Sequence, residues 1–283
     1  MRRRLDAELV RRGLATSRTQ ARELVESGRV RVAGAPSVKV TRMVDAGEPV
    51  VVEGEPARFV GRGGEKLQGA LDRFDLALDG ARVLDAGAST GGFTDCALQH
   101  GAREVVALDV GHGQLHERLR RDPRVVVIER TNLRHVDPAD LGPFDAVVAD
   151  LSFISLTKVM SVLVRSCAPD GWLVLLVKPQ FEAGRAEVSK GRGVITDPAT
   201  WTVALEGVVA GAEALGATVE GLAPSPLRGG DGNVEFLLHL RAPARSLVDA
   251  PLRDAPDGTT VSGAARAAID AAVGEVAQAV ATP

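Results

Sequence analysis

The sequence predicts an α/β protein, with a mostly parallel sheet covered by helices on both faces and preceded by a small α+β module. Two observations support this fold class. From about residue 65 onward, apolar stretches typical of strands alternate with stretches typical of helices. Residues 1–42 hold 11 basic against 4 acidic side chains, whereas the whole chain has a net charge of −3. A basic front part on an acidic body indicates that the front part binds a polyanion.

Residues 1–58 are predicted to form the front module. In "RLDAELVRRG", Leu5, Leu9 and Val10 share one helical face, and a second helix in "SRTQARELVESG" ends at Gly28. Short strands follow in "VRVAG" and "EPVVVEG". A solvated basic face is the alternative for any single arginine, but the cluster favours phosphate binding. The candidate residues are Arg2, Arg3, Arg4, Arg11, Arg12, Arg18, Arg22, Lys39, Arg42 and Arg62.

Residues 59–64, "FVGRGG", are predicted to link this module to a second domain over residues 65–245. Its strands are expected in "ARVLDAG", "EVVALDVG", "VVVIERT", "FDAVVADLSF", "GWLVLLVK", "ATVEGLAP" and "NVEFLLHL", with helices such as "FTDCALQHG" between them. The last strand follows its predecessor after a short gap, so we expect these two strands to pair antiparallel.

Residues 246–283 differ in composition and are rich in Ala, Asp, Pro and Gly. Ile269, Val273, Val276 and Val280 have the spacing of a narrow helical stripe, but the composition favours a mobile tail.

The composition is that of a soluble protein. No run of about 18 apolar residues predicts a membrane span, and the basic N-terminus lacks the apolar core of a signal peptide. Cys96 and Cys167 are far apart and lie in apolar surroundings, so we expect free buried thiols. These features predict a cytoplasmic protein.

The stretch "VLDAGASTGGFTD", residues 83–95, is the strongest ligand-binding signal. An apolar strand ends in Asp85, and a loop of small residues leads into a helix, so a ligand can approach the backbone. The glycines Gly87, Gly91 and Gly92 do not match the dinucleotide fingerprint, which disfavours a nicotinamide dehydrogenase. Asp85 suits a positively charged group, and Asp109 at the next strand end suits ribose hydroxyls. Together they indicate S-adenosylmethionine; the alternative is that both acids only cap strands.

Ionisable residues end several apolar strands. Asp150 follows "VVA" and Lys178 follows "WLVLLV", so both are expected at the edge of the sheet where ligands bind, and Glu235 can face the same edge. The chain has 29 Arg and only 5 Lys. Because a lysine can lose its proton and act as a base, whereas arginine effectively cannot, Lys178 is a candidate catalytic residue. Lys66 is a second candidate; the alternative is a surface helix residue.

The sequence resembles two known families. The stretch "RLDAELVRRGLATSRTQARELVESGRVRVAG" resembles an S4-type RNA-binding domain, and "DAGASTGGFTD", "VVADLSFISL", "LVKPQFE" and "GNVEFLLHL" resemble the FtsJ-like methyltransferase domain of the TlyA family. The resemblance covers about residues 3–241. It implies a Rossmann-like, class I methyltransferase sheet and 2′-O-methylation of cytidine in ribosomal RNA, with S-adenosylmethionine as the methyl donor. Members of the family were once labelled haemolysins.

The resemblance also implies roles for individual residues. A catalytic tetrad is implied at Lys66, Asp150, Lys178 and Glu235, and the basic front module is expected to bind ribosomal RNA within the subunits. The implied cofactor-binding residues are Asp85, Gly87, Ser89, Thr90, Gly91, Gly92, Phe93, Asp109, Val110 and Asn132. No metal is expected, because the sulfonium carries its own positive charge.

Two alternatives remain. A non-catalytic ribosome-assembly factor would bind RNA through the same module but would need no intact acid and base set. Another S-adenosylmethionine-dependent enzyme could methylate a base or a protein, although "DLSF" after the fourth strand of the predicted sheet differs from the motif of base N-methyltransferases. The N-terminal stretch "MRRRLDAELVRRG" resembles that of family members that act on both ribosomal subunits, and this resemblance implies modification of both.

Overall fold

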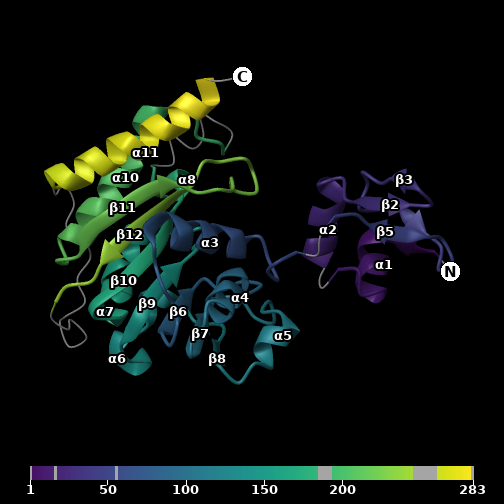
Figure 1. Cartoon of the computed structure of the whole chain (residues 1–283), viewed down its shortest axis with the longest axis horizontal. Coiled ribbons are helices and arrows are strands. Elements are labelled where there is room, and N and C mark those ends of the chain that lie inside the picture. Colours follow the sequence, from purple (N-terminus) through teal and green to yellow (C-terminus); the bar gives the residue numbers. More distant parts are fainter. Residues whose placement is uncertain (1, 16–17, 55–56, 184–192, 245–259, 282–283) are drawn as a thin grey trace. The chain divides into compact units, whose positions relative to one another are not determined.

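The computed structural model describes residues 2–15, 18–54, 57–183, 193–244 and 260–281 (Figure 1). The chain divides into two compact units, Met1–Gly61 and Arg62–Pro283. Among the described residues, no helix combines the length and the apolar character needed to cross a membrane.

The first unit contains two helices and short antiparallel strands. Its elements are β1 (Arg3–Arg4), α1 (Leu5–Arg11), α2 (Arg18–Glu26), β2 (Val30–Val32), β3 (Ala35–Pro36), β4 (Met43–Val44) and β5 (Val50–Val52). β2 lies between β3 and β5, and β1 pairs with β4. Leu5 and Leu9 on α1 pack with Val30 and Val32 on β2 in a small apolar core, as the periodicity of both segments predicts.

The second unit is a layered α/β structure. Its strands are β6 (Arg82–Ala86), β7 (Glu104–Leu108), β8 (Val125–Ile128), β9 (Phe144–Ala149), β10 (Cys167–Val177), β11 (Thr218–Pro224) and β12 (Phe236–Arg241). Its helices are α3 (Gly63–Phe74), α4 (Gly92–Gln99), α5 (Glu117–Arg120), α6 (Pro138–Leu141), α7 (Met160–Ser166), α8 (Pro179–Glu182), α10 (Pro198–Glu213) and α11 (Gly263–Ala281), with short 3-10 turns η1 (Leu133–His135) and η2 (Leu156–Lys158).

In the described part of the chain, seven strands form one sheet in the order β11-β12-β10-β9-β6-β7-β8. β6 to β10 run parallel to one another, whereas β12 is antiparallel to both β10 and β11. The predicted α/β fold class is confirmed, as is the antiparallel pairing of the last two strands. The first and fourth strands of the unit, β6 and β9, lie side by side at the centre, which places their ends where a ligand is expected.

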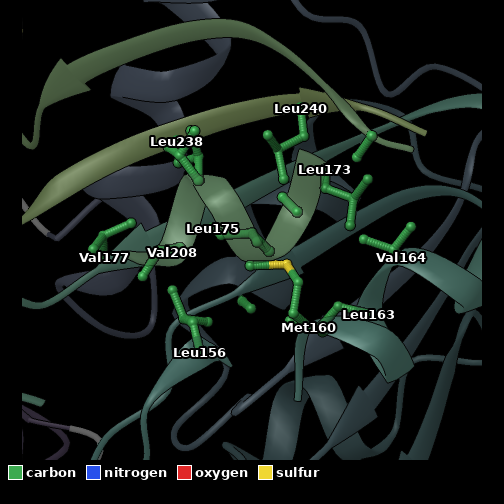
Figure 2. Packing of buried hydrophobic residues seen from close by; sticks show 14 of the residues in the cluster. Leu156, Met160, Leu163, Val164, Leu173, Leu175, Val177, Val208, Leu238 and Leu240 are labelled. Carbon is green, nitrogen blue, oxygen red and sulfur yellow. The ribbon is translucent and has the colours of Figure 1, made fainter. Parts of the chain in front are cut away.

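Alternate residues of the strands face opposite layers of helices. Leu175 and Val177 of β10 belong to the large core with α7 and α10, in which Met160 of α7 is buried (Figure 2). On the other face, His239 of β12 stacks on Phe74 of α3, with ring centroids 5.3 Å apart. The two layers hold the sheet rigid, so that side chains at its carboxyl edge start from fixed positions.

The predicted linker and tail are both corrected by the structure. Gly63 and Gly64 belong to α3, so the second unit begins inside the predicted linker of residues 59–64. Residues 263–281 form α11, which packs on β11 and α10, so the prediction of a mobile tail is wrong there. The apolar stripe explains this result, because Ile269, Val273 and Val276 are buried. Residues 246–259 and the side chain of Val280 lie outside the described part.

Candidate active site

Four ionisable side chains meet at the carboxyl edge of the sheet. Lys66 comes from α3, Asp150 follows β9, Lys178 follows β10, and Glu235 precedes β12. Because β12 runs antiparallel to β10, the beginning of β12 lies beside the end of β10. This reversal is why a residue before a strand joins residues that follow strands.

The four side chains form a chain of alternating charges. Lys178 Nζ lies 2.7 Å from Asp150 Oδ1, and Lys66 Nζ lies 3.5 Å from Asp150 Oδ2 and 2.6 Å from Glu235 Oε2. Lys66, Lys178 and Glu235 are buried. Two ammonium groups and two carboxylates sum to zero formal charge, and each buried charge has a partner of opposite sign, which offsets part of the cost of its burial.

Lys178 has a second oxygen partner. Its Nζ donates a hydrogen bond of 2.9 Å to Ser152 Oγ, in addition to its ion pair with Asp150. An ammonium group has three N–H donors, so two oxygens fix its direction and one donor has no acceptor among the described residues. Lys178 can therefore present one N–H, or the lone pair of its neutral form, to a substrate oxygen.

Phe153 lies beside this cluster and is almost fully exposed. Its side chain is 92% exposed, and its φ of 67° lies in the left-handed region that bulky residues rarely adopt. Its ring lies 5.5 Å from that of Phe181, at an interplanar angle of 50°. Strain of this kind persists where the surroundings impose it, and it is common at functional sites.

A cavity of about 600 Å³ opens at the same edge of the sheet. Its walls include six of the predicted site residues, namely Gly87, Ser89, Asp109, Val110, Asn132 and Asp150. The volume is in the range of ordinary small-molecule sites. The cavity and the charged chain share Asp150, so a ligand in the cavity would lie next to Lys178.

Gly87 allows this close arrangement of strand ends. Its φ is +86°, and a Cβ there would lie 2.8 Å from the carbonyl oxygen of Asp150 and 3.0 Å from Leu151 Cδ2. Only glycine satisfies both the conformation and the contact. Gly87 N–H also donates to the carbonyl of Leu108, which ties the loop after β6 to the end of β7.

The rest of the glycine-rich loop does not line the cavity. Thr90 and Gly91 lead into α4, which begins with Gly92 and Phe93, and a Cβ on Gly91 would clash with Leu119 Cδ1. These residues fix the conformation of the loop on its side toward α4, away from the cavity. Of the predicted residues in this loop, Gly87 and Ser89 line the cavity, and the predicted contacts of the others with a cofactor stay a prediction.

Asp85 departs from its predicted place. It is 1% exposed, does not line the cavity, and accepts a hydrogen bond of 2.6 Å from Thr94 Oγ1 of α4. Burial raises the pKa of Asp85 to about 7, against the opposing effect of the Thr94 hydrogen bond. Its Oδ1 is buried without a hydrogen-bond partner among the described residues. Asp85 thus faces the underside of α4 in this structure, and its predicted role in cofactor binding stays a prediction.

Asp109 organises the loop around the cavity. Its Oδ2 accepts 2.8 Å from the Ser89 N–H, and its Oδ1 accepts 2.6 Å from the Gly111 N–H. Carboxylate oxygens can accept further bonds, so hydroxyl groups of a ligand remain possible partners. Asn132 accepts from the Arg134 N–H and begins η1, which makes it a turn residue as well as a wall of the cavity.

The predicted basic residues of the first unit have different surroundings. Those that form ion pairs with acids are Arg2, Arg4, Arg11, Arg12, Arg18 and Arg42. Arg3, Arg22 and Lys39 are exposed, with no acidic partner among the described residues. Arg12 is 18% exposed and also donates to three backbone carbonyls, of Asp45, Ala46 and Glu48. Its guanidinium is committed to the fold of the unit.

Exposed arginines of the second unit follow a simple pattern. Away from the site each described one pairs with an acid, as the examples Arg73 with Glu275 and Arg121 with Glu117 show. The exposed arginines that have no acidic partner within 4.0 Å in the described ranges are Arg62, Arg130, Arg134 and Arg228. Arg62 precedes α3, Arg130 follows β8, Arg134 lies in η1 and Arg228 lies between β11 and β12, all at the carboxyl edge of the sheet. The edge thus combines the four ion-paired side chains, whose formal charges sum to zero, with the positive charge of these four arginines.

Comparisons with known proteins agree with this geometry. The sequence pattern of the FtsJ-like methyltransferases matches residues 59–242, and that of the S4 domain matches residues 3–50. The "16S/23S rRNA (cytidine-2'-O)-methyltransferase TlyA" of Mycobacterium tuberculosis is 51% identical over 255 residues, which cover 89% of this chain and 95% of the relative. The chain belongs to the TlyA family of FtsJ-like methyltransferases. Hemolysin A of Brachyspira hyodysenteriae is 40% identical, over 83% of this chain and 98% of the relative.

Solved structures in the same group support the TlyA-type architecture. One from Streptococcus thermophilus, which carries the hemolysin name, has a TM-score of 0.71 and 38% identity and covers 98% of each chain. Another from Lactococcus lactis, also so named, has a TM-score of 0.67 and 41% identity, over 78% of this chain and 100% of that one.

In this TlyA family member, several site residues escape sequence reasoning. Ser152 and Phe153 follow Asp150 directly, and only the three-dimensional structure turns their side chains toward Lys178 and Phe181. Gln114 lines the cavity from the loop after β7, where its Oε1 lies 3.3 Å from Ser89 Oγ. A polar residue in a glycine-rich loop has no periodic signal that would reveal it.

Proposed function

We propose that this protein transfers a methyl group from S-adenosylmethionine to the 2′-hydroxyl of cytidine in ribosomal RNA. The charged chain Lys178–Asp150–Lys66–Glu235 beside the cavity is the observation that carries this proposal. The name of the relative from M. tuberculosis supports the choice of nucleotide and RNA. The proposal includes both ribosomal subunits as substrates.

The residues of the cavity fit S-adenosylmethionine. The missing side chain of Gly87 leaves its backbone open to the ligand, and Asp109 offers acceptors for ribose hydroxyls. Asp150 supplies a negative charge between the cavity and Lys178. When bound, S-adenosylmethionine supplies an electrophilic methyl group on a positively charged sulfur.

In this proposal Lys178 acts on the attacking oxygen. Its amine, held by Asp150 and Ser152, accepts the proton of the 2′-hydroxyl or stabilises the developing alkoxide. Lys66, held by Glu235, keeps Asp150 in place from the other side. Fixed side chains of this kind accelerate a reaction mainly by aligning the reacting atoms.

Phe153 is suited to hold the target nucleotide. Nucleobases unstacked from RNA commonly stack on exposed aromatic rings. Phe153 presents such a ring at the mouth of the cavity, with Phe181 behind it. A base on Phe153 would place its own ribose near Lys178.

The unpaired arginines at the edge support RNA binding by the second unit as well as by the S4-like unit. Arg62→Ala is expected to weaken binding of ribosomal RNA and to reduce the salt dependence of log K by about one phosphate contact. The matched control is Arg73→Ala near the end of α3, the helix that Arg62 precedes, because Arg73 already pairs with Glu275. Filter binding at several salt concentrations measures both slopes. Equal slopes for the two variants would contradict a phosphate contact at Arg62.

Methyl incorporation from radiolabelled S-adenosylmethionine tests the proposed function. The substrates are separate small and large ribosomal subunits from a strain that lacks the enzyme. Alkali-resistant dinucleotides that contain the label on cytidine ribose are expected from both subunits. Tight binding of the subunits without any label would favour the non-catalytic assembly factor instead, and label on a base would favour a different methyltransferase.

A further inference from the structure

Two loops that carry catalytic candidates are joined at both ends. They are residues 150–157, which follow β9, and residues 178–182, which follow the neighbouring parallel strand β10. At the end nearest the sheet, Lys178 Nζ contacts Asp150 Oδ1 at 2.7 Å and Ser152 Oγ at 2.9 Å. This junction belongs to the site already described.

Glu182 makes the junction at the far end. Its Oε2 accepts 2.6 Å from Ser155 Oγ, and its Oε1 accepts 2.8 Å from the N–H of Leu156. Leu156 is buried in the core of the second unit, so the backbone N–H that Glu182 contacts is held in a fixed position. Lys178 and Glu182 lie at opposite ends of the single turn of α8, because Lys178 caps it and Glu182 ends it.

The segment between the two junctions needs restraint. Phe153 lies between them with its φ of 67° and its exposed ring, which packs beside the Phe181 ring of the other loop. A bulky residue in this conformation relaxes to a commoner one unless both flanks are fixed. Such a relaxation would move Ser152, which helps to direct the amine of Lys178.

Stability alone does not explain an acid at position 182. Burial raises the pKa of Glu182, despite the hydrogen bonds from Ser155 and Leu156 that oppose the shift. No lysine or arginine among the described residues lies within 4.0 Å of its carboxylate. A partly buried carboxylate that faces two neutral donors costs free energy that a neutral residue would avoid. The Glu182 carboxylate does supply two hydrogen-bond acceptors on one rigid group, and these can hold residues 155 and 156 in place.

We propose that Glu182 is a positioning residue for methyl transfer, because it clamps residues 150–157 so that Ser152 and Asp150 keep the amine of Lys178 directed at the substrate. This inference rests on the proposed function. It assigns no contact between Glu182 and the reacting atoms.

The test uses the full chain with Glu182→Ala and the nearly isosteric Glu182→Gln. At saturating S-adenosylmethionine and ribosomal subunits, kcat is expected to fall about 10- to 100-fold in Glu182→Ala, with KM for the subunits within about twofold of wild type. Glu182→Gln keeps one acceptor oxygen and is expected to have an intermediate kcat. Amide hydrogen exchange of the peptide 150–157 should accelerate in the same order, in the absence of any substrate.

Glu213→Ala is the matched control. Glu213 Oε2 accepts 2.9 Å from the Ser262 N–H, so this carboxylate also holds a loop of the second unit, but it does so on α10 beside α11. Its removal should lower Tm without lowering kcat. Unchanged kcat in Glu182→Ala, or an equal loss of kcat in Glu213→Ala, would overturn the proposal. If the wild type transfers no methyl group, the proposed function fails, and unchanged exchange of 150–157 would separately reject the clamp.

Discussion

Lys178→Ala is expected to lower methyl transfer about 10²- to 10⁴-fold, which is the usual contribution of a positioned acid or base. The substitution removes the amine that Asp150 and Ser152 direct. Asp150 keeps Lys66 as a partner, so no buried carboxylate is left without a positive charge and the fold should persist. Binding of S-adenosylmethionine, measured by calorimetry, should change little, which separates chemistry from binding.

Two further variants sharpen this prediction. Lys178→Arg keeps the positive charge but removes a usable base, so its activity should fall nearly as far as that of the alanine variant. Lys158→Ala on η2 is the matched control, because this exposed lysine lies near in sequence but outside the charged chain. Full activity in Lys178→Arg would assign Lys178 a purely electrostatic role, and full activity in Lys178→Ala would remove it from the mechanism.

Gly87→Ala is expected to reduce affinity for S-adenosylmethionine at least tenfold and to lower the free energy of unfolding by about 1–3 kcal/mol. The new Cβ would lie 2.8 Å from the carbonyl of Asp150, so either the loop or the end of β9 must move. Both movements disturb the wall of the cavity and the position of the Asp150 carboxylate. Denaturant unfolding and calorimetric titration measure the two effects.

Gly80→Ala is the control for Gly87→Ala, because it distinguishes the effect of backbone strain at a positive φ from the effect of a steric contact of the new Cβ. Gly80 also has a positive φ, of 69°, but a Cβ there meets no atom within 4 Å. Its replacement should therefore cost stability through the backbone alone and leave cofactor affinity unchanged. Similar losses of affinity in both variants would show that Gly87 has no special role beside the cavity.

Strand ends were the most predictable part of the structure. The apolar runs before Asp150 and Lys178 are long enough to be strands, and parallel strands place their ends on one edge, so the meeting of these residues follows from the sequence. Lys66 is different, because it lies on a helix before the first strand of the sheet. The contact of Lys66 with Glu235 depends on how α3 packs against the sheet, and only the family resemblance indicated that these two residues belong to one site.

Other features of the structure could not be predicted from the sequence, because tertiary packing decides them. Asp85 is one residue from the end of β6, and the alternation of the strand turns it under α4 toward Thr94 rather than into the cavity. Composition suggested a mobile tail, but a few apolar residues at helical spacing suffice when a sheet face is available, as Ile269 shows. Arg12 carries a charge like its neighbours, and nothing in the sequence reveals that it holds backbone carbonyls.

The order of strands has a consequence for how the protein is made on the ribosome. β11 pairs only with β12 in the described part of the sheet, and β12 also covers the edge of β10, although it is the last strand to be synthesised. Until residues 235–241 have emerged, β10 remains an open edge, β11 has no partner and Lys66 lacks Glu235. We therefore expect the nascent chain to be prone to association until β12 inserts, and completion of the sheet and the pairing of Lys66 with Glu235 are then one event.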